Sequence, residues 1–174
     1  MESQDLPNEQ VGSSNDGGQD EIVLIPTLDL TFTKEAEERY PETKTVNPIT
    51  YTDLYYTYNH SYRELKRAHA ELGHRVGKAE KLIDERKGEL LIDHYPEFLA
   101  KFPKQKDNGE LRSAFMSKDL RLSKLLDDRN TLKAMEELVG AKIKFVERTC
   151  SFMDKQIQIH LKSGIDPKLY VTLK

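Results

Sequence analysis

Tryptophan is absent from this 174-residue chain, and Cys150 is its single cysteine. One thiol cannot close an internal disulfide, which favours a reducing, cytoplasmic environment. No apolar run approaches the roughly 18 residues that a membrane span needs. The first twenty residues also lack the basic region and apolar stretch of a secretory signal. The sequence therefore predicts a cytoplasmic protein that makes no membrane contact.

Recognisable catalytic and metal-binding motifs are missing as well. The sequence contains no P-loop, GxGxxG, HExxH, CxxC or GxSxG pattern. Five histidines occur, and no two of them have the four-residue spacing of a helical metal site: His60, His69, His74, His94 and His160. Cys150 falls in an apolar helical stretch with no evident base partner, which is typical of an inert buried thiol. We therefore predict no catalytic residue, no metal site, no cofactor and no enzymatic activity.

Charge is unevenly distributed along the chain. Residues 1–48 hold 11 acidic and 3 basic residues, a net charge of −8, whereas the remainder holds 24 basic and 19 acidic residues, a net charge of +5. The polar start of the chain predicts an acidic, mostly disordered arm. Within the arm, residues 22–32 are apolar and extended because Pro26 blocks a helix, and residues 40–48 form a linker. The apolar segment either packs on the protein's own body or docks on a partner as an added strand.

A long helix is predicted from Thr50 to about residue 93. Thr50 and Asp53 resemble a capping box, and no later proline occurs before Pro96. Two mainly apolar series with seven-residue spacing predict a coiled coil: Tyr55, Tyr62, His69, Val76, Ile83 and Leu90, and Tyr51, Tyr58, Leu65, Leu72, Ala79 and Arg86. Such a helix is roughly 65 Å long, so a partner must cover its apolar seam. We expect self-association through six of these residues: Tyr58, Tyr62, Leu65, Leu72, Val76 and Ile83.

The rest of the chain predicts that this helix is one arm of a hairpin. Turn-forming residues between 95 and 108 precede a second helical region from about Glu110 to Lys162, with a kink or break at residues 127–130. The final helix would fold back on the first, residues 111–127 would brace the turn, and oligomerisation would complete the burial. The predicted fold class is all-α: a long coiled-coil-like helical hairpin with a short bracing helix and a disordered N-terminal arm. Its predicted parts are an arm at residues 1–48, a helical coiled-coil domain at 49–163 and a short extended tail at 164–174.

Two groups of basic residues are candidates for binding nucleic acid. A stripe opposite the seam suits a phosphate backbone, although most such faces are simply solvated: Arg63, Arg67, His74, Lys78 and Lys81. At the turn, aromatic rings alternate with Lys101, Lys104 and Lys106, the combination that non-specific single-strand binding requires. The alternative for the turn is that Tyr95 and Phe98 plug the end of the hairpin.

The order of these parts resembles the UvsY family of phage recombination mediators. The likeness rests on the heptad-like helix that ends at His94-Tyr95, on the segment from Glu110 to Phe115, and on the final stretch from Val146 to Ile157. It covers roughly residues 55–162 and is one of pattern. The sequence departs from the family in its acidic arm and in residues 84–88, which lie where the family's basic DNA-binding element would fall.

The resemblance implies a small, helical, ring-forming protein that binds single-stranded DNA. Such a mediator loads a RecA-like recombinase in exchange for the single-strand-binding protein. We therefore expect an oligomeric accessory protein of DNA recombination, repair or replication that acts without catalysis, in the host cytoplasm if it comes from a phage. The alternative is a coiled-coil adaptor or structural oligomer with no nucleic-acid role. The acidic arm would cover the basic stripe in the absence of DNA or bind a basic partner, so deleting residues 1–48 should tighten DNA binding.

Overall fold

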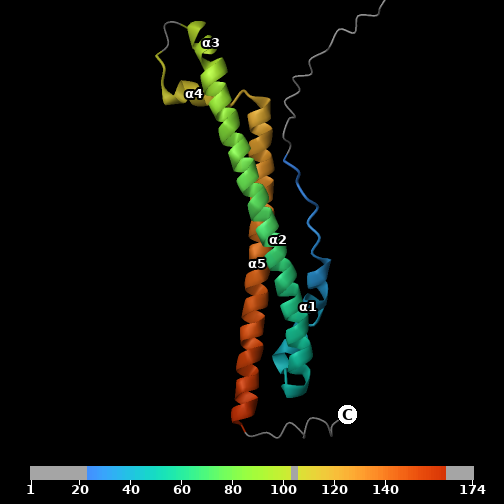
Figure 1. The fold of residues 1–174 in the computed structure, drawn as a ribbon. Coiled ribbons are helices and arrows are strands. Elements are labelled where there is room, and N and C mark those ends of the chain that lie inside the picture. Colours follow the sequence, from blue (N-terminus) through green and yellow to red (C-terminus); the bar gives the residue numbers. More distant parts are fainter. Residues whose placement is uncertain (1–22, 103–105, 164–174) are drawn as a thin grey trace, which may run out of the picture.

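Two long antiparallel helices form the body of the protein (Figure 1). The computed structural model describes residues 23–102 and 106–163, and within these residues it contains helices and no strand. α2 (Pro48–Glu89) continues through a π-helical turn (Leu90–His94) into α3 (Tyr95–Ala100). α4 (Gly109–Met116) lies at the turn, and α5 (Leu120–Lys162) runs back beside α2. The prediction of an all-α helical hairpin is confirmed.

α2 begins two residues before the predicted start at Thr50. Pro48 occupies its first turn, where the missing N–H does no harm. Asn47 is the N-cap, because its side-chain oxygen accepts hydrogen bonds from the backbone N–H groups of Ile49 (2.9 Å) and Thr50 (3.0 Å). The Thr50 hydroxyl in turn accepts from the backbone N–H of Asn47 at 3.2 Å. The capping box is therefore Asn47/Thr50 and not Thr50/Asp53.

α2 contributes a line of buried side chains to a seam with α5. These residues recur three, four or seven positions apart, as in a coiled coil: Leu54, Tyr58, Ser61, Leu65, Leu72, Val76, Ala79, Ile83 and Leu90. The predicted series through Tyr58 lies in the seam, but the series through Tyr55 is displaced in its first half, where Tyr55 is exposed and Ser61 is buried. The displacement arises because the seam advances by eleven residues from Leu65 to Val76, which shifts the heptad register.

The residues predicted to join two copies face α5 of the same chain instead. Five of them are at most 7% exposed: Tyr58, Leu65, Leu72, Val76 and Ile83. The sixth, Tyr62, is half-buried and donates a hydrogen bond to Glu147 of α5 at 3.2 Å. The reason is that the hairpin supplies the covering helix itself. A second copy could reach these side chains only if the hairpin opened.

α5 is a single helix of 43 residues, without the predicted break at residues 127–130. Leu125 and Leu132 are buried on either side of that polar stretch, so the seam holds the helix together across it. The actual break lies earlier, between α4 and α5. There the Asp119 side chain accepts from the backbone N–H of Leu122 at 2.6 Å and caps α5. The segment predicted to brace the turn is therefore divided, and only α4 braces it.

The long helix passes through Pro96, where a turn was predicted. A proline inside an α-helix removes one hydrogen bond and its ring clashes with the carbonyl four residues earlier. Here the π-helical turn Leu90–His94 precedes Pro96 and widens the backbone spiral. The widened turn accommodates the proline, and the helix continues to Ala100.

Residues 23–46, named the strap below, run along the α2–α5 hairpin (Figure 1). Their first part is extended, and three short helices follow: Thr31–Thr33, α1 (Lys34–Glu38) and Tyr40–Thr45. Val23, Ala36 and Val46 are at most 6% exposed. Three side chains of α2 donate hydrogen bonds to backbone carbonyls of the strap: Tyr58 to Ala36 (2.7 Å), Ser61 to Phe32 (3.0 Å) and Arg75 to Leu24 (2.7 Å).

The strap decides between the two predicted interpretations of the apolar segment, which packs on the protein's own body. It also shortens the predicted arm and replaces the predicted linker at residues 40–48 with helix. Small hydroxyl side chains make this possible, since Thr33 and Thr43 donate to the carbonyls of Leu30 and Tyr40 and close the short helical turns. The predicted disordered start and the predicted tail at 164–174 fall outside the described residues.

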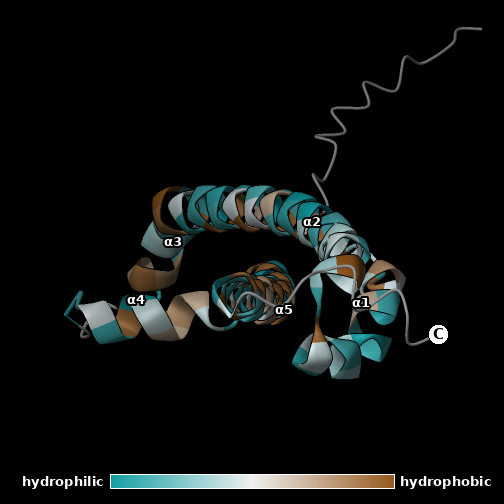
Figure 2. Cartoon of the chain, turned by 90° about the horizontal axis from the view of Figure 1, so that it is seen from below, coloured by the Kyte–Doolittle hydropathy of each residue, from teal (hydrophilic) through white to brown (hydrophobic). Residues whose placement is uncertain are grey.

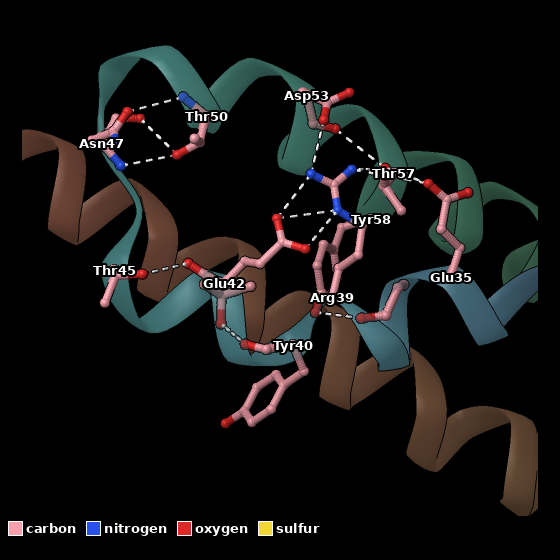
Figure 3. A network of polar contacts seen from close by, with 12 residues as sticks. Glu35, Arg39, Tyr40, Glu42, Thr45, Asn47, Thr50, Asp53, Thr57 and Tyr58 are labelled. Atoms are coloured by element: carbon pink, nitrogen blue, oxygen red, sulfur yellow. Dashed lines mark hydrogen bonds and ion pairs between the residues drawn. The ribbon is translucent and has the colours of Figure 1, made fainter. Parts of the chain in front are cut away.

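Arg39 fastens the strap to α2 (Figure 3). Its guanidinium donates to Glu42 of the strap (3.1 Å) and to Asp53 of α2 (2.8 Å), and it also reaches the Thr57 hydroxyl (3.2 Å). Hydrogen bonds to Glu42 and then Asp53 raise the pKa of Arg39. Because Arg39 bonds to both elements, it ties the strap to α2 with charge-assisted hydrogen bonds.

Candidate nucleic-acid interface

The predicted basic stripe lies along the outer face of α2. All five residues are exposed: Arg63, Arg67, His74, Lys78 and Lys81. They alternate along the helix with Leu65, Leu72 and Ala79, which are buried on the opposite side. α2 is uninterrupted over these 19 residues, so the stripe is a row roughly 27 Å long. Figure 2, which looks along the hairpin, shows mostly hydrophilic residues on the visible side of α2.

Acidic neighbours on α2 partly neutralise the stripe. Glu64 lies 3.0 Å from Arg67, and Glu85 lies 3.5 Å from Lys81. Exposed ion pairs of this kind contribute about 0–1 kcal/mol and are screened by salt. A phosphate backbone could therefore compete for Arg67 and Lys81 at little cost. The row is therefore a partly neutralised basic surface whose ion pairs weaken as the salt concentration rises.

The structure separates the second predicted group, at the turn, from the stripe. Lys101 and Lys106 are exposed, whereas Lys104 lies outside the described residues. Lys101 follows Lys81 by twenty residues, about 30 Å along the helix. The predicted binding residues therefore form two groups at different levels of the hairpin.

The aromatic rings at the turn pack on one another, and we call them the apical cluster: Tyr95, Phe98, Phe102 and Phe115. Ring centroids lie 5.0 Å apart for Phe98 and Phe115 and 5.4 Å apart for Tyr95 and Phe115. Tyr95 is buried, and its hydroxyl donates to Asp107 at 2.8 Å. Tyr95 and Phe98 thus plug the hairpin end, which is the second of the two predicted alternatives. Phe102 remains 44% exposed beside Lys101.

A hollow of about 500 Å³ lies beside the apical cluster, where α2 and α3 face the start of α5. Its lining joins apolar side chains with cations and one acid: Arg86, Leu90, His94, Phe98, Phe115, Lys118 and Asp119. Arg86 donates to Asp119 at 2.6 Å and to Glu89 at 2.7 Å. The hydrogen bond from Arg86 holds the pKa of Asp119 below its ordinary value. Sequence reasoning did not find this hollow, because Phe98 and Phe115 come from opposite sides of the turn.

α5 carries a further set of exposed residues that sequence reasoning did not separate from the seam. Leu138, Phe152 and Ile159 are 50%, 41% and 60% exposed and recur at multiples of seven residues. Arg148, Lys155 and Lys162 are also exposed and recur every seven residues. Both rows, together named the α5 outer row, lie outside the buried seam. The seven-residue spacing was the signal in the sequence that could have identified them.

Cys150 and His69 are a thiol and an imidazole within the helical hairpin. Cys150 is half-buried, and burial, with a smaller effect of Asp154, raises the pKa of its thiol to about 11. It therefore stays protonated at neutral pH, as an unreactive thiol does. His69 lies in the α2–α5 interface, 3.9 Å from Glu136. Within residues 23–102 and 106–163, no three His, Cys, Asp or Glu side chains gather as a metal ion would require.

Comparison with protein-family models, with curated proteins and with solved structures gives no match to this chain. The resemblance to the UvsY family therefore stays a prediction from the sequence. No helix in the described part of the chain combines the length and apolarity needed to cross a membrane.

Proposed function

We propose that this protein is a non-catalytic accessory protein that binds single-stranded DNA along the outer face of α2. The observation that carries the proposal is the row of exposed cations on one uninterrupted helix. When cations neutralise a phosphate backbone, condensed counterions are released, and this gain needs no pocket. A rigid helix also presents its cations without first having to order them.

The proposed binding is weak for a single copy, because Glu64 and Glu85 hold two of the cations. Several copies on one strand would add their contacts by avidity. We therefore include self-association in the proposal and place it on the α5 outer row, since the seam residues are used inside the chain. Apolar side chains seven residues apart match the repeat of another supercoiled helix.

The proposed biological role is DNA recombination, repair or replication in the host cytoplasm of an infected cell. In that role the protein would help a RecA-like recombinase replace the single-strand-binding protein on DNA. This part of the proposal is supported by the order of helices and basic segments that resembles the UvsY family. It requires no cofactor.

The proposal is tested by titrating the full-length protein into a fluorescent single-stranded oligonucleotide at several salt concentrations. We expect the logarithm of affinity to fall linearly with the logarithm of salt concentration. Replacing Arg63 or Lys81 by alanine should each make that slope shallower by about 0.7–1. Lys34→Ala is the matched control, because Lys34 is equally exposed but lies on the strap.

A second candidate function is a protein adaptor or structural oligomer with no nucleic-acid role. The α5 outer row favours it, since three large apolar side chains are exposed along one line: Leu138, Phe152 and Ile159. The same titration separates the two candidates. Absence of binding at about 50 mM salt, with oligomers still present by light scattering, would contradict the DNA-binding proposal and favour the adaptor.

A further inference from the structure

We propose that the hollow at the apex is a stacking site for one base of the bound single strand. This inference rests on the proposed function and deepens it. The stripe on α2 supplies cations for phosphates, whereas the hollow would make binding depend on the presence of a base.

The hollow is lined by aromatic rings on which a base could stack. Phe98 and Phe115 both line it, and both remain half-buried rather than fully enclosed. Leu90, which is 4% exposed, adds an apolar side chain to the lining. Bases stack on aromatic side chains regardless of sequence, because every base has a π face. A volume of about 500 Å³ falls within the range of small-molecule sites and admits a planar ring.

The lining of the hollow carries a small positive charge. Arg86 and Lys118 are basic and Asp119 is acidic, so the lining has a net charge of +1 with His94 neutral. Asp119 is already bonded to Arg86, which limits its repulsion of a phosphate. Lys118 and His94 are exposed and stand where a phosphate next to a stacked base could approach. An uncharged apolar side chain from a protein partner would leave the Lys118 charge without a counterpart.

Measured along the axis of α2, the hollow begins close to the end of the stripe. Arg86 follows Lys81, the last residue of the stripe, by five residues, or about 7.5 Å along α2. Arg86 continues the seven-residue series of Leu72 and Ala79, so it lies on the seam side of α2 and not on the outer face that carries the stripe. A strand that leaves the stripe near Lys81 and passes around α2 to the seam side would engage phosphate contacts and a base contact on the same protein.

The experiment compares two fluorescent strands of equal length and charge on the full-length protein. One strand is oligothymidine, and the other has the same backbone without bases. The stripe should bind both, whereas the hollow should favour oligothymidine by about tenfold. Phe115→Leu keeps apolar volume but removes the aromatic face, and it should bring the ratio of the two affinities close to one. Phe98→Leu should act in the same direction.

Matched controls isolate the hollow. Phe152→Leu removes an exposed aromatic ring on α5, and the preference for bases should be unchanged. Lys118→Gln should weaken binding of both strands more than Lys124→Gln, which removes an exposed cation outside the hollow. Thermal unfolding of each variant shows whether the helices are intact. If Phe115→Leu does not fold, Phe98→Leu and Lys118→Gln still decide the result.

The outcomes distinguish this inference from the proposed function. Equal affinity of the wild-type protein for the two strands would overturn the stacking site and leave DNA binding in place. The same follows if folded Phe98→Leu and Phe115→Leu both keep the full preference for bases. Failure of the wild-type protein to bind either strand would overturn both proposals.

Discussion

The two ends of the hairpin are built differently. At the end where α2 begins, the strap forms a third layer, and small polar side chains are buried between the layers: Thr33, Thr57, Ser61 and Thr149. Beyond Arg75, which donates to the Leu24 carbonyl, the buried α2 side chains are aliphatic, and among the described residues they face α5. The strapped end therefore combines three elements with hydrogen bonds, whereas the bare end depends on a two-helix seam and its apical cluster.

This difference shows how a helical hairpin can be stabilised at one end and keep an accessible surface at the other. A hairpin of two helices leaves both sides of its seam accessible to water, and it gains little burial from each residue. The strap covers one side where α2 begins. The other end of the hairpin carries the hollow, on the seam side of α2, and the last cations of the stripe, on the outer face of α2. Stability and accessible surface are thus assigned to opposite ends.

The largest expected effect tests whether the strap is an integral layer. Tyr58 is 0% exposed and donates to the Ala36 carbonyl, and burial raises its pKa to about 12. Tyr58→Ala should lower the free energy of unfolding by about 3–5 kcal/mol, because it leaves a cavity between three elements. Urea unfolding followed by circular dichroism measures this change.

Two variants of the same helix calibrate that result. Tyr58→Phe removes only the hydrogen bond to the strap and should cost about 1 kcal/mol. Tyr56→Ala is the exposed control, since Tyr56 is 75% exposed, and its effect should stay within about 0.5 kcal/mol. If Tyr58→Ala cost no more than Tyr56→Ala, the strap would not be packed on α2, and the contrast between the two ends would disappear.

A smaller effect, dependent on pH, is expected at the bare end. Asp119, at the start of α5, forms an ion pair with Arg86, and the two side chains are 15% and 16% exposed. The hydrogen bond from Arg86 lowers the pKa of Asp119 in the folded protein. The stabilisation of the fold by the Asp119 carboxylate is therefore complete above the ordinary pKa of 3.8, and it is lost as the pH falls through the lower pKa of the folded protein. Asp119→Asn keeps an N-cap side chain but removes the charge.

We expect Asp119→Asn to lower the free energy of unfolding by about 1–2 kcal/mol at neutral pH. The difference from the wild-type protein should begin to shrink near pH 3.8, where the Asp119 carboxyl of the unfolded wild-type chain becomes protonated, and should go on shrinking until the pH falls through the lower pKa of the folded protein. Urea unfolding at a series of pH values measures it. A difference that stayed constant down to pH 2 would show that the lost charge is not its cause.

The buried residues of the seam were predicted correctly where the seven-residue period holds, and the prediction failed where that period changes. Leu65, Leu72 and Ala79 are seven residues apart and apolar, so their burial followed from the sequence. Ser61 gave no such signal, because its burial depends on the Phe32 carbonyl, 29 positions earlier. Packing of residues 22–32 on the body was one of two predicted alternatives, but the helical part of the strap was missed, because Ala36 and Val46 are too widely spaced to form a periodic pattern.

The candidate site divides in the same way. The exposure of Arg63 and Lys81 follows from helical periodicity once the seam is known, and it was predicted. The hollow depends on a turn that brings Phe98 beside Phe115, and on Arg86 reaching Asp119 across 33 positions. Such contacts arise from tertiary packing, for which local patterns hold no signal. The α5 outer row lies between these cases, because its repeat is visible but its exposure is not.

The smallest expected effect concerns a glycine at the bare end. Gly77 lies inside α2, and a β-carbon built on it would meet nothing within 4 Å. Alanine is favoured over glycine inside a helix by about 0.5–1 kcal/mol. Gly77→Ala should therefore stabilise the protein by that amount in urea unfolding. Gly73→Ala should gain less, because its added β-carbon would lie 3.2 Å from a Glu136 carboxylate oxygen, which must move aside.

This last comparison also tests whether the bare end is truly uncovered. Gly77 lies beside Lys78, on the exposed side of α2. If another copy packed closely on that side, the added methyl group would separate the two chains and Gly77→Ala would destabilise the protein. The loss would then grow with protein concentration, because only the associated form would be affected. A gain in stability that is independent of concentration is what an open outer face predicts, and an open face is what the stripe needs to contact DNA.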